Sequence, residues 1–152
     1  MLFRSWRIFE MDLATGKRRL IAPDGVQPVP HPVSPDGMWV LGRTAGNELK
    51  MYPVNGGAPR SVTGVDAEET PVRWSDDGRS LFLSRTSRLP GTLARLDLAT
   101  GKKTTWKDLL PPDKAGVQYI SSVQAAASGK AYAYTYKRVR SEERRVGKEC
   151  RL

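Results

Sequence analysis

Apolar and polar residues alternate in short runs through most of the chain. The clearest runs lie at 39–41, 81–83 and 132–136, where every second residue is a large apolar or aromatic one. This period of two is that of side chains along a β-strand, whereas a helix repeats every three or four residues. Glycine, proline, aspartate and asparagine bound the runs. The pattern predicts an all-β protein built from short strands.

A recurring four-residue turn separates some of these runs. Ser34-Pro35-Asp36-Gly37 precedes one apolar run, Ser75-Asp76-Asp77-Gly78 precedes another, and a degenerate copy lies at 127–130. Asp-Gly suits a tight reversal because glycine adopts the positive φ that the turn requires. One such turn offers only two or three oxygen ligands, without EF-hand spacing, so we expect its aspartates to shape the hairpin rather than bind calcium.

A second signal repeats with nearly the same period. The phrase DLATGK occurs at 12–17 and again at 97–102, and a related glycine turn closes the run ending at Gly57. These glycine turns are 41 and 44 residues apart, while the turns at Gly37, Gly78 and Gly129 are 41 and 51 apart. Two interleaved signals of this kind predict tandem structural units.

Each unit is predicted to hold four antiparallel strands. In the clearest copy the strands are expected at roughly 70–75, 79–85, 92–98 and 103–106. A four-stranded unit repeated every forty-odd residues is typical of a β-propeller blade, which buries its faces by stacking on its neighbours. The prediction is a partial propeller with two complete blades flanked by half blades. Its expected parts are a half blade at 6–22, blades at 28–64 and 69–110, and a half blade at 117–137.

These motifs resemble the WD40-like, Pro-Asp-containing (PD40) repeats of TolB-type propellers. Trp74-Ser75-Asp76-Asp77-Gly78 keeps the family's Trp-Ser-Pro-Asp-Gly pattern with aspartate for proline, and Val33 replaces the tryptophan in the other copy. GKAYAYTYKRV at 129–139 resembles the closing blade of the C-terminal propellers of bacterial serine/threonine protein kinases.

The resemblance implies a non-catalytic binding or sensor module. Such a module would offer a rim or central channel to a protein or small-molecule ligand. Related repeats also precede oligopeptidase catalytic domains, follow winged-helix DNA-binding domains and form periplasmic TolB. A prolyl-oligopeptidase-like hydrolase and a periplasmic scaffold are therefore the alternatives. The resemblance favours an extracytoplasmic or periplasmic location.

The two ends of the chain resemble translated sequencing adapter. MLFRS occupies 1–5 and RSEERRVGKEC occupies 140–150. We therefore interpret residues 1–5 and 140–152 as artefact and 6–139 as a propeller fragment. The alternative is a native basic tail. A fragment exposes apolar blade faces, so missing blades of the same chain are expected partners, and 6–139 alone is expected to be insoluble, oligomeric or loosely folded.

Setting the ends aside weakens the case for a nucleic-acid partner. The chain has 25 basic and 16 acidic residues, a net charge of +9. Omitting 1–5 and 140–152 removes six basic and three acidic residues, which leaves +6, and removes the single cysteine. The remaining basic residues are scattered along turns and strand ends, so we expect no nucleic-acid partner. No apolar run approaches eighteen residues, so no membrane segment is expected.

The sequence offers no catalytic constellation. It lacks a G-x-S-x-G elbow, a phosphate-binding P-loop and the kinase motifs. The only histidine, His31, lies between Pro30 and Pro32, where we expect stiff, extended backbone at the surface. We expect no cofactor and no metal. The acidic residues at 66 and 68–69 are expected to be solvated.

Aromatic and arginine side chains provide the remaining candidates. Core packing between blades is expected for four alternating aromatics, which are Trp39, Trp74, Phe82 and Tyr134. Trp106, on a predicted outermost strand, is less constrained. Three arginines follow inner strands near a rim of the disc and are the candidates for ligand binding: Arg43, Arg85 and Arg88.

Overall fold

The computed structural model describes residues 6–139, so both adapter-like segments, 1–5 and 140–152, lie outside the described residues. This described part consists of β-strands and turns, without a helix, which confirms the all-β prediction. No segment within 6–139 forms a helix capable of spanning a membrane. The strands are β1 (Phe9–Met11), β2 (Arg18–Leu20), β3 (Gln27–Val33), β4 (Trp39–Arg43), β5 (Leu49–Pro53), β6 (Arg60–Ser61), β7 (Thr70–Trp74), β8 (Ser80–Arg85), β9 (Gly91–Asp97), β10 (Lys103–Leu109), β11 (Val117–Ala125) and β12 (Tyr132–Arg138).

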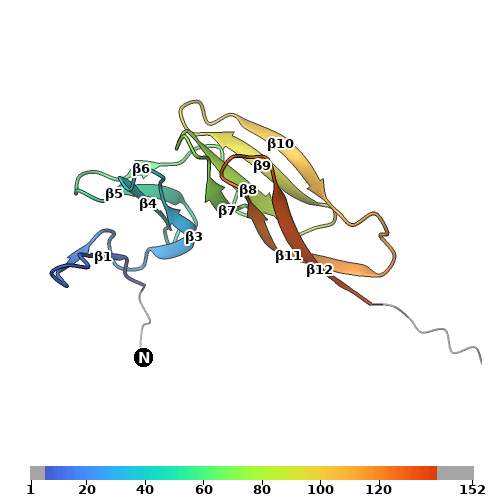
Figure 1. The fold of residues 1–152 in the computed structure, drawn as a ribbon, viewed down its shortest axis with the longest axis horizontal. Helices are drawn as coiled ribbons and strands as arrows, with labels where there is room; N and C mark the ends of the chain where they lie inside the picture. Colours follow the sequence, from blue (N-terminus) through green and yellow to red (C-terminus); the bar gives the residue numbers. More distant parts are fainter. Residues whose placement is uncertain (1–5, 140–152) are drawn as a thin grey trace, which may run out of the picture.

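The strands form four antiparallel sheets in which each strand pairs with the next along the chain. β3–β6 and β7–β10 are four-stranded, while β1–β2 and β11–β12 are two-stranded. The two-stranded sheets lie at opposite ends of the row of sheets (Figure 1). The fold is therefore part of a β-propeller, with two blades flanked by half blades, as predicted. In the second blade the strand ends lie within one residue of the predicted ones, except that β10 continues three residues further, to Leu109.

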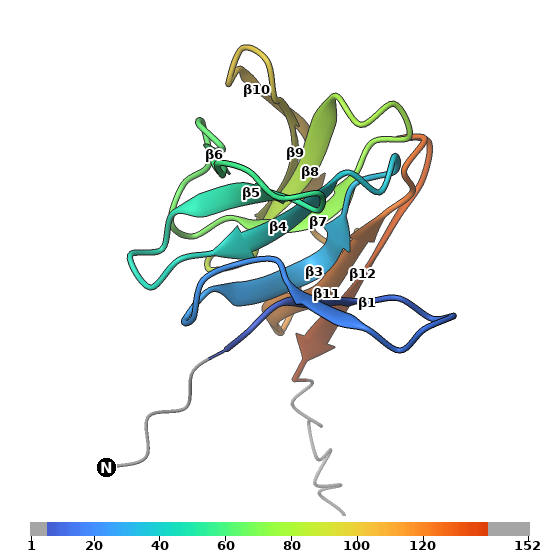
Figure 2. The same ribbon diagram turned by 90° about the vertical axis from the view of Figure 1, so that its left-hand side faces the viewer.

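The first strands of successive sheets lie next to one another. β7 contacts β3 on one side and β11 on the other (Figure 2). These strands occupy the innermost position of each blade, the position that lines the channel of a closed propeller. The later strands of each sheet lie progressively further out.

The buried apolar residues form three separate clusters, one at each joint between successive sheets. The N-terminal joint joins β1–β2 to β3–β6 and contains Ala22, Val26 and Tyr52. The central joint joins the two four-stranded sheets and contains Val29, Leu41, Leu49, Val62, Trp74, Leu81, Leu83 and Leu96. The C-terminal joint joins β7–β10 to β11–β12 and contains Val72, Phe82, Leu93, Leu109, Ile120, Val123 and Ala125. Each sheet thus has a core on each face that meets a neighbour.

The aromatic residues pack in these joints, as predicted. Trp74 and Phe82 are buried, Trp39 packs against the central joint, and Tyr134 packs against the C-terminal joint. Trp106 on β10 also joins the C-terminal joint, with its ring centroid 5.3 Å from that of Phe82. Aromatic pairs at such separations add to the stabilisation from buried area.

Gly42 permits close packing at the N-terminal joint. A Cβ placed on Gly42 would lie 2.4 Å from Cγ1 of Val26 and 3.3 Å from Cδ1 of Ile8. Because valine is stiff at χ1, Val26 cannot easily move aside. The bare backbone of β4 at this point lets the first sheet approach the second.

Candidate functional site

The two predicted turns have the same internal hydrogen bonds. The Asp36 carboxylate accepts from the Ser34 hydroxyl and from the Met38 N–H, and Gly37 has a φ of 71°. These two hydrogen bonds, led by that from Ser34, lower the pKa of Asp36. Pro35 occupies the second position of the turn and takes no part in this bonding.

In the second turn Asp77 is the residue equivalent to Asp36. Its carboxylate accepts from the Ser75 hydroxyl at 2.6 Å and from the Arg79 N–H at 3.0 Å, and Gly78 has a φ of 67°. The pKa of Asp77 is lowered by the hydrogen bond from Ser75 and then by that from Arg79. Asp76 stands where Pro35 stands in the first turn, and its N–H donates to the Ala127 carbonyl at 3.0 Å. The two aspartates of this turn therefore differ in surroundings.

Asp76 borders a cavity of about 410 Å³ at the ends of the innermost strands, here called the inner-strand cavity. Three consecutive sheets contribute to its wall, which is lined by His31, Pro32, Val33, Pro35, Arg73, Trp74, Asp76 and Ala127. The Trp74 indole N–H donates to the Pro32 carbonyl at 3.3 Å and so ties β7 to β3 beneath the cavity. The site exists only because neighbouring blades stand side by side.

His31 reaches this cavity through a distortion of β3. It is exposed, as expected, but its φ is 46°, so the expectation of extended backbone between the two prolines is wrong. The β3–β4 register shifts between Pro28 and Val33, as at a β-bulge. A bulge redirects one side chain out of the strand's regular alternation, and a left-handed non-glycine residue is uncommon.

The inner-strand cavity combines three kinds of polar group with an apolar floor. Arg73 supplies a cation, Asp76 a carboxylate and His31 an imidazole, while Trp74 and the prolines supply apolar surface. Concave sites with a few polar groups over apolar walls are typical of ligand binding. Within residues 6–139, no group of three or more histidine, cysteine, aspartate or glutamate side chains is placed to hold a metal ion.

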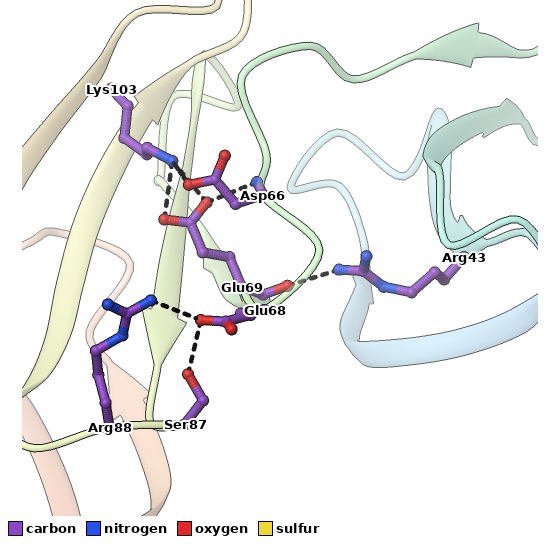
Figure 3. Close-up of polar contacts among 7 residues, drawn as sticks. All are labelled: Arg43, Asp66, Glu68, Glu69, Ser87, Arg88 and Lys103. Atoms are coloured by element: carbon purple, nitrogen blue, oxygen red, sulfur yellow. Dashed lines mark hydrogen bonds and ion pairs between the residues drawn. The ribbon is translucent and has the colours of Figure 1, made fainter.

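Two of the three candidate arginines, Arg43 and Arg88, lie around the loop that joins the two four-stranded sheets, residues 62–69, here called the inter-sheet loop (Figure 3). Arg43, at the end of β4, donates from Nη2 to the Glu69 carbonyl at 2.6 Å and from Nη1 to the Asn47 carbonyl at 2.9 Å. Burial lowers the pKa of Arg43. Its guanidinium thus links β4 to the start of the next sheet.

Arg88 and Arg85 flank the same loop from the second sheet. Arg88 Nη2 lies 3.2 Å from Oε2 of Glu68, and the Ser87 hydroxyl donates to that oxygen at 2.9 Å (Figure 3). The pKa of Glu68 is lowered by the Ser87 hydrogen bond, then by Arg88, with a smaller effect from the charge of Arg85. Arg88 and Glu68 are both more than half exposed, and exposed pairs of this kind contribute little stability.

The acidic cluster of the inter-sheet loop is not solvated as a whole, which corrects the expectation from sequence. The Glu69 side chain is 5% exposed and pairs with Lys103 Nζ at 2.8 Å, while Asp66 pairs with the same ammonium at 2.9 Å (Figure 3). Glu69 also accepts from the Asp66 N–H at 3.0 Å. Burial would lower the pKa of Lys103, but its hydrogen bonds with Glu69 and Asp66 outweigh that effect and raise it.

Lys103 and Arg73 are not among the site residues predicted from the sequence. Lys103 lies 34 positions from Glu69, and no local pattern links them. For Arg73 the sequence does hold a signal, because this charged residue stands between the apolar residues Val72 and Trp74. On β7 both neighbours are buried and Arg73 is exposed. Arg73 is exposed near the end of an innermost strand, where it lines the inner-strand cavity.

The fold and these two sites define a partial propeller with an inner-strand cavity. No family model matches the chain, and no curated protein matches it. Among solved structures, the chain is similar to TolB from Acinetobacter baumannii, with a TM-score of 0.58 and 16% identity over 86% of this chain and 37% of that chain. The chain therefore has a TolB-like propeller fold, and it spans 37% of the length of that neighbour.

Proposed function

We propose that this chain is a non-catalytic binding or sensor module of the β-propeller type, which holds a protein segment or small ligand at the inner-strand cavity. The observation that carries the proposal is the cavity's assembly from three sheets, with Arg73, Asp76 and His31 around Trp74. A rigid, preformed site of this kind binds without a large ordering cost. The inter-sheet loop is less suited to ligand binding, because Arg43 and Lys103 already bond to Glu69 there.

We further propose that the module belongs to a larger bacterial protein, such as a serine/threonine kinase. Two observations support this. The chain aligns with 37% of its solved neighbour, and residues 129–139 resemble the closing blade of kinase-associated propellers. Residues 6–139 would then be native, with the half blades and blades at the ranges given above, and residues 1–5 and 140–152 would be adapter-derived.

Sequencing the source locus outward from the codons of Trp6 and Val139 tests the parentage. We expect the reading frame to continue through further blades, with a kinase domain upstream. A downstream G-x-S-x-G would instead identify an oligopeptidase-like hydrolase, and an upstream signal peptide with no kinase would identify a periplasmic scaffold. Genomic DNA that encodes both terminal segments, followed by a stop after Leu152, would refute the adapter interpretation.

Binding at the cavity is tested with a random peptide library displayed on phage and panned against the 152-residue chain. Arg73→Glu reverses the cation at the cavity, while Lys107→Glu makes the same change at an exposed position on β10. Peptides selected on the parent chain should lose at least tenfold in affinity for Arg73→Glu and bind Lys107→Glu normally. Equal binding to both variants would place the site elsewhere.

A further inference from the structure

Two charged side chains of the inner-strand cavity have no partner among residues 6–139. The guanidinium of Arg73 and the carboxylate of Asp76 are exposed, and within this range neither makes a hydrogen bond, an ion pair or a ring contact. They also do not pair with each other, although they stand three positions apart and carry opposite charges. The cavity thus holds a cation and an anion that are both available to a ligand.

The second turn does not require the carboxylate of Asp76. In the equivalent turns of the neighbouring sheets this position is occupied by Pro35 and Ala127. The carboxylate that shapes the second turn is that of Asp77, which accepts from the Ser75 hydroxyl at 2.6 Å. The backbone of Asp76 is fixed because its N–H donates to the Ala127 carbonyl of the next sheet at 3.0 Å. The Asp76 carboxylate is therefore carried on a fixed backbone and has no part in shaping the turn.

Arg73 is likewise particular to the second blade. The equivalent positions on the two neighbouring innermost strands are occupied by the uncharged residues Pro32 and Gln124. Next to Arg73, the buried indole of Trp74 donates to the Pro32 carbonyl at 3.3 Å, which fixes this part of β7. The arginine and the carboxylate of the cavity therefore come from one blade, beside apolar surface that the preceding blade supplies.

His31 adds a third polar group to the wall of the cavity. Its backbone has a φ of 46°, and its imidazole makes no hydrogen bond within the described part of the chain. A non-glycine residue keeps such a backbone only where the surrounding structure holds it, and residues of this kind cluster at ligand-binding sites. An imidazole can donate to a ligand or accept from it.

Opposite charges that stay apart in one cavity match a ligand with two opposite charges of its own. Arginine binds a carboxylate through charge-assisted hydrogen bonds, and an ammonium donates to a carboxylate in the same way. Val33 is 54% exposed and, with the prolines, offers apolar surface to the rest of the ligand. The cavity volume of about 410 Å³ lies near the lower end of the range of about 300–1,000 Å³ that is usual for small-molecule sites. These features favour a small molecule.

We propose that the inner-strand cavity binds a small zwitterion with an apolar body, which is the chemistry of an α-amino acid with a large apolar side chain. The carboxylate of the ligand binds Arg73, its ammonium binds Asp76, and its side chain lies on the apolar surface beside Val33. This inference rests on the proposed function and narrows it to one chemical class. Both charged ends of the ligand are needed, because each one neutralises a different group of the cavity.

The first test is isothermal titration calorimetry with the unmodified 152-residue chain. L-phenylalanine carries all three features, and each of three relatives lacks one. L-phenylalaninamide lacks the carboxylate, N-acetyl-L-phenylalanine lacks the ammonium, and glycine lacks the apolar side chain. We expect L-phenylalanine to bind about tenfold more tightly than each relative, because each missing group leaves part of the cavity without its partner. Absence of saturable L-phenylalanine binding, or equal affinity for all four probes, would overturn the proposal.

Two variants assign the charges to the named residues. Arg73→Met should weaken L-phenylalanine binding about tenfold without weakening that of L-phenylalaninamide, and Asp76→Asn should do the same without weakening that of N-acetyl-L-phenylalanine. Lys107→Met and Asp108→Asn are matched controls, because both residues are exposed on β10. They should bind every probe as the parent chain does. Unchanged affinity for L-phenylalanine in Arg73→Met or Asp76→Asn, or an equal loss in the controls, would refute this assignment.

Panning with the phage-displayed library separates this inference from the proposed function. If L-phenylalanine does not bind but selected peptides depend on Arg73, the cavity holds a protein segment and only the zwitterion inference is wrong. If neither L-phenylalanine nor any selected peptide depends on Arg73, the proposed function of the cavity is wrong as well.

Discussion

The ammonium of Lys103 lies 2.8 Å from Oε2 of Glu69, a carboxylate that is only 5% exposed. Lys103 begins the outermost strand of the second blade, and Glu69 immediately precedes its innermost strand. The pair thus connects the two margins of one sheet. Arg43 extends the connection to the preceding sheet, because its guanidinium donates to the carbonyl of the same Glu69.

Removing the cation should destabilise the fold. In Lys103→Met the buried Glu69 carboxylate loses both of its hydrogen bonds from the ammonium. Leaving a buried charged group without its partner costs about 2 kcal/mol, so urea unfolding at fixed chain concentration should show a loss of that size. Lys107→Met, at an exposed position on the same strand, is the control and should change the free energy of unfolding by less than about 0.5 kcal/mol. Equal losses in the two variants would mean that the ion pair adds nothing.

The same ion pair gives a defined dependence on pH. The pKa of Lys103 is raised above its ordinary 10.5, so its contribution to stability is complete below that value and is lost as pH rises through the folded-state pKa. The pKa of Asp66 is lowered below its ordinary 3.8, mainly by its hydrogen bond with Lys103, so its contribution is present above 3.8 and is lost as pH falls through the folded-state pKa.

The measurement is the difference in unfolding free energy between the parent chain and Lys103→Met as a function of pH. We expect a constant difference from about pH 5 to pH 9 that shrinks at both extremes. Using the difference cancels the effect of other carboxylates with lowered pKa, such as Asp36 and Asp97. A difference that varies steadily across the neutral range would contradict this assignment.

Ser75 should be a stabilising residue of the second turn. Its buried hydroxyl accepts from the Ser80 N–H at 3.0 Å and donates to Asp77 at 2.6 Å. Ser75→Ala leaves the buried Ser80 N–H without that acceptor, and we expect a loss of about 1–2 kcal/mol in thermal or urea unfolding. Ser128→Ala, in the degenerate third turn, alters only an exposed hydroxyl 3.4 Å from Lys130 N and should be nearly neutral. A larger loss of unfolding free energy in Ser128→Ala than in Ser75→Ala would show that the hydrogen bonds of the second turn do not set stability.

Gly42→Ala should loosen the N-terminal joint. The added methyl would overlap Val26, and relieving such overpacking typically costs about 1–3 kcal/mol. Gly46→Ala is the control, because neither glycine has a positive φ and the nearest atom to a Cβ on Gly46 is 3.8 Å away. In urea unfolding we expect Gly42→Ala to lower the free energy of unfolding and Gly46→Ala to leave it unchanged.

Much of the fold follows from local sequence. The Asp-Gly turns and the alternation around Leu81 and Tyr134 locate strands because turn geometry and side-chain period are properties of a few adjacent residues. The repeated DLATGK then shows how the units recur. Strand order in this fold needs no long-range information, since each strand pairs with its neighbour in sequence.

The site depends on contacts that local sequence does not encode. Glu69 is buried because Lys103, 34 positions later, lies over it, and nothing in the acidic loop itself signals that partner. The left-handed backbone at His31 could not be predicted from local sequence either. A left-handed residue is usually a glycine, but here the conformation occurs at a histidine where the β3–β4 register shifts. The distinct surroundings of Asp76 and Asp77 become visible only when Ala127 of the next sheet is in place.

The division of the core into three joints has a consequence for how the molecule opens. Each cluster is held by two adjacent sheets, so local unfolding can be confined to one joint while the others persist. The N-terminal joint has three buried residues and the central joint has eight. Amide hydrogens should therefore exchange fastest in β1 and β2 and slowest in β8 and β9, giving a gradient of protection along the chain instead of one global rate.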